Sequence, residues 1–145
     1  MKNSLNTRVI AGKTTGFVIG LIGFFAIPMV MPEATLMLQF GFLFWYTMMG
    51  AMIGFLGVMD SHPWFHFRMN AWFRGIFFGG FMNLALALIA YDTLEALFAT
   101  ASMFTGMSPF WLVLEGAIVG LIIDLIATKK GGEGPRTVID QESIA

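Results

Sequence analysis

Two acidic residues, Glu115 and Asp124, lie inside an apolar stretch that runs from residue 110 to residue 130 and reads FWLVLEGAIVGLIIDLIATKK. The length and composition of this stretch are typical of a helix that crosses a membrane, and two lysines close it. A carboxylate that faces lipid costs about 2.5 to 3.5 kcal/mol on insertion scales, so we expect Glu115 to face other helices or a water-filled space. A carboxyl group that can take up a proton at this depth is a common component of proton or cation translocation.

The two acids point to opposite sides of the predicted helix. They are nine residues apart, which corresponds to about 900° of helical rotation and places them half a turn out of phase. They therefore cannot share a proton within one chain. One acid can serve a contact inside the chain while the other serves a contact to a neighbouring chain, which favours a homo-oligomer or a larger complex. A structural role for Asp124 is also open, because Thr128 and Lys129 lie within about a turn and the headgroup region is close.

Other polar residues are expected at the level of Glu115. At a rise of about 1.5 Å per helical residue, Glu115 lies about 21 Å and Asp124 about 8 Å from Lys129. Tyr46 lies about 20 Å inside its own predicted helix, and Asn83 lies about 14 Å inside the next one. The candidate ion- or proton-responsive residues are therefore Glu115, Asp124, Asn83 and Tyr46. Two interpretations of Glu115 stay open: it responds to protons or ions, or it is neutral and joins helices through hydrogen bonds.

Four apolar segments predict an all-α integral membrane protein with a bundle of four antiparallel transmembrane helices. Hydrophobic residues make up 57% of the chain and charged residues only 12%, which is too apolar for a soluble domain of 145 residues. The membrane domain is expected over residues 15–128, after a polar segment over residues 1–14. Its predicted spans cover residues 15–31, 36–59, 71–98 and 110–128. The tail, residues 129–145, mixes glycine, proline and charge, so we expect it to be flexible unless a partner holds it.

The basic residues predict the orientation of the bundle. All eight lie before the first span, around the connection between the second and third spans, or after the fourth, and none lies in the other two loops. The positive-inside rule then places both termini in the cytoplasm and the protein in the inner cell membrane. A basic segment before an apolar run also resembles a secretory signal peptide. This run is long and its cleavage signal is poor, which favours an uncleaved span.

The connection between the second and third spans, residues 60–70, mixes aromatic and basic residues (DSHPWFHFRMN), as expected for a short interfacial segment in the headgroup region. In a helical conformation, residues spaced by four would form one stripe that contacts water: His62, His66, Asn70 and Arg74. Trp64, Phe65 and Trp72 would then anchor in lipid. The predicted interfacial residues are His62, Trp64, His66, Arg68, Trp72 and Arg74.

Each predicted helix carries glycines four residues apart, a spacing that lets helix backbones approach closely in lipid. The predicted helix-packing residues are Gly16, Gly20, Gly50, Gly54, Gly75, Gly79, Gly116 and Gly120. Three of the four pairs fall in the cytoplasmic half, so we expect the bundle to narrow towards the cytoplasm and to open towards the other face. The alternative is that glycine is simply common in membrane helices. The similar glycine segments of the first two spans carry too little information to indicate a repeat.

Several function classes find no support. The chain has no cysteine, which excludes disulfides and thiolate catalysis. His62 and His66 have a spacing that suits a metal ion, but they lack a convincing fourth ligand, so we predict no metal site. With no nucleotide-binding loop and no nucleophile next to a base, we do not expect an enzyme. Topology and headgroup attraction explain the basic residues without nucleic acid. No cofactor is predicted, although a bound lipid is expected.

Two functions remain after these exclusions. The first is a structural or assembly subunit that packs through its glycines with copies of itself or with another membrane protein. The second is a small ion- or proton-coupled transporter or channel that uses Glu115. In both cases the lipid bilayer is the surrounding partner.

Overall fold

The chain is folded into helices, as seen in a computed structural model that describes residues 4–62, 64 and 66–142. The helices are α1 (Leu5–Val30), α2 (Leu36–Leu56), α3 (Ala71–Ile89), α4 (Tyr91–Thr100), α5 (Trp111–Gly131) and α6 (Arg136–Glu142). Four of them, α1, α2, α3 and α5, are long and apolar enough to cross a membrane. Within the described ranges no β-strand is present, so the prediction of an all-helical chain with four apolar spans is confirmed.

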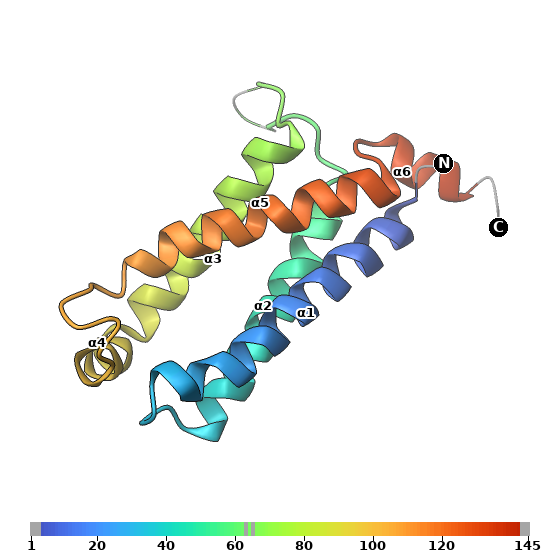
Figure 1. Ribbon diagram of the computed structural model, residues 1–145. Coiled ribbons are helices and arrows are strands. Elements are labelled where there is room, and N and C mark those ends of the chain that lie inside the picture. Colours follow the sequence, from blue (N-terminus) through green and yellow to red (C-terminus); the bar gives the residue numbers. More distant parts are fainter. Residues whose placement is uncertain (1–3, 63, 65, 143–145) are drawn as a thin grey trace.

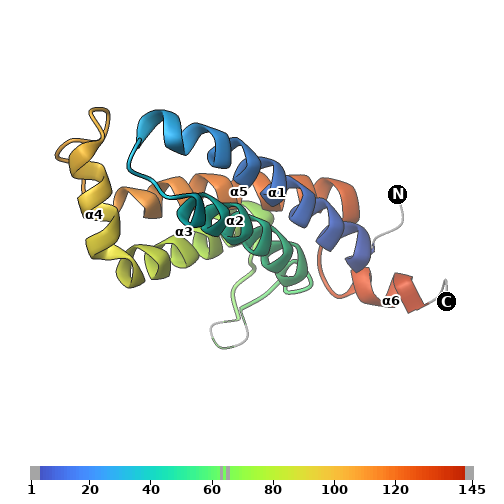
Figure 2. The same cartoon turned by 90° about the horizontal axis from the view of Figure 1, so that it is seen from below.

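Both hairpins of long helices start and finish at the same end of the molecule (Figure 1). We call this end, where α1 begins and α5 finishes, the terminal end. The opposite end, where α4 lies, is the α4 end. Figure 2 shows α4 lying across the ends of α3 and α5.

Helix α1 starts ten residues before the predicted first span. Ser4 caps it, and its hydroxyl accepts a hydrogen bond from the backbone N–H of Thr7. Serine is a favoured N-cap residue because its side chain satisfies a free N–H of the first turn. The apolar pattern therefore predicts only the part of α1 that can span the membrane. The Ser4 cap determines where the helix begins. The added turns bring Arg8 into the helix, where its side chain is fully buried.

The prediction of one continuous helix over residues 71–98 is wrong. The chain leaves the helical conformation at Ala90, with φ −109° and ψ 20°, and α4 then follows in a new direction. This turn buries Leu94 and Phe98 almost completely. Burial of a large apolar side chain is worth about 1.5 to 3 kcal/mol, which offsets the interruption of the helix.

Two closely packed helix pairs, α1 with α2 and α3 with α5, form the bundle (Figure 1). In the first pair, a Cβ atom at Gly16 would strike the backbone carbonyl of Tyr46, and one at Gly50 would strike Gly12. In the second pair, Cβ atoms at Gly79 and Gly120 would collide with the backbone of the facing helix. All eight predicted helix-packing glycines lie in these two seams, which are contacts within one chain.

A small apolar core joins the two pairs. Met49 and Ile53 of α2 pack with Val119 and Ile123 of α5, and Tyr46 closes the cluster. Three of these side chains, Met49, Ile53 and Ile123, are completely buried. The contact between α2 and α5 therefore holds the two helix pairs together near the middle of the bundle.

In the connection between α2 and α3, the described residues 57–62, 64 and 66–70 form no helix. The connection contains a short hairpin, in which Ser61 bridges Arg68 and the backbone N–H of His62 donates to the carbonyl of Phe67 over 2.9 Å. The predicted stripe of residues spaced by four therefore does not form, because these backbone groups pair across the hairpin. Trp64 and Trp72 are exposed, as expected for anchors, and Phe65 lies outside the described residues.

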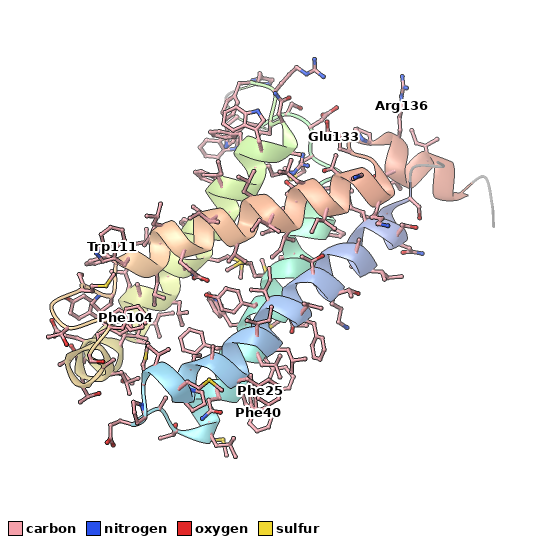
Figure 3. All side chains as sticks on the ribbon, in the orientation of Figure 1. Phe25, Phe40, Phe104, Trp111, Glu133 and Arg136 are labelled. Carbon is pink, nitrogen blue, oxygen red and sulfur yellow. The ribbon has the colours of Figure 1, made fainter. Side chains whose placement is uncertain are left out.

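Residues 129–142 of the tail fold back onto the terminal end, where composition alone predicts a flexible segment. Gly132 and Gly134 adopt positive φ angles of 77° and 83°, which reverse the chain after α5. The N–H of Gly134 then donates to the carbonyl of Gly57 over 2.8 Å, and Thr137 is fully buried. Figure 3 labels Glu133 and Arg136 in this part of the molecule.

The glycine seams predict the effect of single methyl groups on stability. A Cβ at Gly16 would collide with the α2 backbone, whereas one at Gly23 of the same helix would meet nothing within 4 Å. We expect Gly16→Ala to lower the free energy of unfolding by about 1 to 3 kcal/mol, because forced overpacking shifts the backbone. Gly23→Ala is the matched control and should leave stability unchanged or slightly higher. Unfolding in mixed micelles followed by circular dichroism measures both, and equal stabilities would contradict the seam.

Candidate functional site

Glu115 lies about one turn inside α5 and is held by two neutral donors. The hydroxyl of Tyr46 donates to its Oε2 over 2.5 Å, and Nδ2 of Asn83 donates to the same oxygen over 2.8 Å. Asn83 is itself positioned from both sides, because Nε1 of Trp45 donates to its Oδ1 over 2.9 Å and its Nδ2 also donates to the carbonyl of Leu112. This network joins α2, α3 and α5.

Gly116 makes room for the network. A Cβ atom at this position would lie 2.5 Å from Cβ and Cγ of Asn83, so a larger residue would displace the asparagine side chain. Asn83 is completely buried, and a buried amide has to be hydrogen-bonded. Asn83 on α3 therefore keeps its position only if residue 116 on α5 is glycine. Of the four residues predicted to respond to ions or protons, the structure brings three together: Glu115, Asn83 and Tyr46.

The second oxygen of Glu115, Oε1, is available to a ligand. Both donors bind Oε2, and Oε1 makes no hydrogen bond to the part of the chain that the structure describes. Glu115 is only partly buried and lines two cavities, so a ligand can approach this oxygen from them. When Glu115 is neutral, its proton is placed on Oε1, since Oε2 already accepts two hydrogen bonds. Proton exchange would therefore take place at the accessible oxygen.

Two adjoining cavities meet at Glu115: the larger lies between α5, α4 and the loop that joins them, and the smaller lies between α1, α2 and α5. Their volumes are about 350 Å³ and 280 Å³. Both are lined by Met31, Phe98, Leu112 and Glu115, so the carboxyl group lies on the wall that they share. The larger cavity extends towards Trp111 and Phe104, which Figure 3 labels beside α4. The bundle is thus hollowed towards the α4 end.

Asp124, the fourth candidate, lies in a separate cluster at the terminal end. It forms ion pairs with two arginines, Arg8 and Arg74, and all three side chains are fully buried. Arg74 binds it in a bidentate manner, with Nε 2.8 Å from Oδ2 and Nη2 3.0 Å from Oδ1. Nη2 of Arg8 donates to Oδ1. The prediction that Arg74 belongs to a water-contacting interfacial stripe is therefore wrong.

The two arginines also join the helix pairs through backbone carbonyls. Arg8 of the first pair donates to the carbonyl of Gly132 over 2.5 Å, and Arg74 of the second pair donates to the carbonyl of Met59 over 3.0 Å. Each arginine thus reaches from its own pair to the chain that follows the other pair. Glu133 lies 3.4 Å from Arg74 and supplies a second negative charge that balances the two cations.

Both acids of α5 therefore find their partners inside the chain. Tyr46 and Asn83 hold Glu115, whereas Arg8 and Arg74 hold Asp124. The expectation that one of them needs a neighbouring chain rested on their opposite directions alone. That reason for an oligomer is removed, because another helix of the same chain packs on each side of α5.

Sequence reasoning missed the role of Arg8 and Arg74, although one signal points to both. The motif FW-x4-GA-x2-G occurs in α2 from Phe44 and again in α5 from Phe110, 66 residues later. Arg8 and Arg74 are separated by the same 66 residues. Burial follows the same register: Gly50 and Gly54 of α2 are buried, and so are Gly116 and Gly120 at the corresponding positions of α5. The second helices of the two pairs are thus related by a short internal repeat, whereas the packing glycines of α1 and α3 do not share its register.

The repeat breaks at the acids. The position in α2 that corresponds to Glu115 is Met49, and the position that corresponds to Asp124 is Val58. Only the second pair therefore supplies carboxylates to the bundle interior. The two histidines are not part of either cluster, and no group of three or more possible metal ligands occurs among residues 4–62, 64 and 66–142.

The cluster around Asp124 predicts a large effect of neutralising its charge. Asp124→Asn would leave two buried arginines with only the half-exposed carboxylate of Glu133, and we expect it to lower the free energy of unfolding by about 3 to 5 kcal/mol. The matched control is Glu133→Gln, because the side chain of Glu133 is 40% exposed. Exposed ion pairs contribute about 0 to 1 kcal/mol, so the control should change stability little. Thermal unfolding in detergent measures both variants, and a mild effect of Asp124→Asn would contradict this account.

Comparisons with known proteins assign no family to the chain. A scan against protein-family models found no match, and searches of curated proteins and of solved structures found none either. The function therefore has to be inferred from two sites: the carboxyl group of Glu115 in its cavity, and Asp124 between two arginines.

Proposed function

We propose that this multi-pass membrane protein is a small proton- or cation-coupled transporter or channel in which Glu115 is the responsive group. The observation that carries the proposal is the asymmetry of its carboxyl group. Oε2 is fixed by Tyr46 and Asn83, whereas Oε1 makes no hydrogen bond to the described residues and Glu115 lines a cavity between the two helix pairs. An ionisable group at membrane depth that faces a cavity is typical of an ion or proton pathway.

The orientation that we propose places the terminal end in the cytoplasm and the α4 end on the other side. The basic residues support this orientation, because they cluster at the terminal end of the bundle. Trp64 and Trp72, with exposed fractions of 83% and 54%, would then lie in the cytoplasmic headgroup region. Lipid would cover the exposed apolar faces of the long helices.

The internal repeat also supports transport. Transporters are often built from two repeats, with the substrate site at the interface between them. Here the smaller cavity lies between α1 and α2 of the first pair and α5 of the second, and it meets the larger cavity at Glu115. The Arg8–Asp124 ion pair closes the cytoplasmic end of the same interface. Access to Glu115 would therefore come from the α4 end in the conformation described.

A pH jump on reconstituted protein tests the proposal. Wild-type protein on a solid-supported membrane should give a transient current, because Glu115 takes up or releases protons within the membrane. Glu115→Gln should abolish this current. Its amide keeps an oxygen that can accept from Tyr46 and Asn83, so the fold should be retained although the group no longer titrates.

Glu95→Gln is the matched control, since Glu95 is an exposed acid near the same end of the molecule. It should leave the current at the wild-type level. A current that persists in Glu115→Gln, or wild-type membranes that behave like protein-free ones, would contradict the proposed role of Glu115.

A structural or assembly subunit is the second candidate, and one observation favours it. The hydrogen bonds of Glu115 join three helices, as expected if a neutral carboxyl group holds them together. Packing with copies of itself or with another membrane protein would then need a surface other than the glycine seams, because these lie inside the chain. Glu115→Ala removes both hydrogen bonds and Glu115→Gln retains them. The assembly role is favoured if only the alanine variant dissociates a complex and no current exists.

A further inference from the structure

We propose that the cavity at Glu115 binds an organic cation with an apolar body, an inference that rests on the proposed function and names its substrate class. The site combines one accessible carboxylate oxygen with walls that are otherwise almost wholly apolar. A ligand that fits this site needs a mostly apolar surface and a single polar group that faces Oε1.

The sign of the ligand charge follows from the lining. Within the residues described, the walls of both cavities include no lysine, arginine or histidine, so nothing there could balance an anion. Ionised Glu115 carries a negative charge that Tyr46 and Asn83 only solvate, since both are neutral donors. A cation next to Oε1 would balance the charge of Glu115, just as Arg8 and Arg74 balance the charge of Asp124.

The aromatic residues of the larger cavity favour an organic cation over a simple metal ion. Phe98 and Phe104 stack with their ring centroids 5.2 Å apart, and Trp111 lies on the same wall. Aromatic faces attract organic ammonium groups, whereas a bare metal ion needs several oxygen ligands. Only one carboxylate oxygen is available here, so a bare metal ion is a poor occupant.

The size of the site agrees with a small organic molecule. The larger cavity has a volume of about 350 Å³, which falls in the range of about 300 to 1,000 Å³ typical of small-molecule sites. It adjoins the second cavity of about 280 Å³ at Glu115, so a ligand can place its charged group at the junction. The apolar part would then extend along Trp111 and Phe104 towards the α4 end.

A pair of probes with the same shape but different charge tests this inference. Benzyltrimethylammonium is a permanent cation, and neopentylbenzene is its neutral carbon counterpart. We expect saturable binding of the cation to wild-type protein in nanodiscs, measured by calorimetry against empty nanodiscs. Glu115→Gln should weaken cation binding about 10- to 100-fold, because the attraction between the quaternary ammonium and the carboxylate is lost. Binding of neopentylbenzene should not change, which also reports that the cavity of the variant is intact.

A second variant tests the aromatic wall. Phe104→Leu keeps an apolar side chain and removes the ring face, and we expect it to weaken cation binding about 2- to 30-fold. Binding of the neutral probe should stay the same. Equal affinity of wild type and Glu115→Gln for the cation, or the absence of saturable cation binding, would overturn the inference.

The outcomes separate this inference from the proposed function. A proton current that depends on Glu115, without binding of the cation, would overturn the substrate class and leave the proposed function standing. Charge-selective binding that depends on Glu115, without any current, would support the binding site and overturn transport.

Discussion

Asp124 is buried with its charge among apolar helices, and a charge in that position needs cations and donors around it. Arg8 and Arg74 supply them, and both arginines are buried in turn. Arg8 also donates to the carbonyl of Gly132 after α5, and Arg74 donates to the carbonyl of Met59 after α2. The buried anion therefore connects the first turns of α1 and α3 to the chain that follows the other helix pair.

The glycine seams explain why these long side chains fit at the terminal end. Close approach within each pair leaves the space between the pairs to larger groups, since the seams themselves contain almost no side chains. At the terminal end that space holds two guanidinium groups and a carboxylate. Towards the α4 end it holds aromatic and aliphatic side chains that do not fill it, and the cavities at Glu115 result.

The two acids of α5 differ because their neighbours differ. Asp124 forms ion pairs with two buried arginines, which makes it a structural group. Glu115 contacts a hydroxyl and an amide, which can stabilise either protonation state, and one of its oxygens stays accessible. The carboxyl group of Asp124 is therefore suited to a structural role at the terminal end. The carboxyl group of Glu115 is suited to exchange with a ligand or a proton towards the α4 end.

The sequence by itself determined that the chain is helical, that four segments can span a membrane and that glycines line the helices, because hydropathy and small-residue spacing are local properties. It also placed Glu115 at the level of Tyr46, since depth follows from the helical rise alone. It did not reveal the break at Ala90, the folded tail or the burial of Arg74. Those depend on contacts between distant segments: Arg8 and Asp124 are 116 residues apart, and Arg74 and Asp124 are 50. Only the tertiary structure decided which arginines neutralise which acid, because the energy of a buried charge depends on the helices that pack around it.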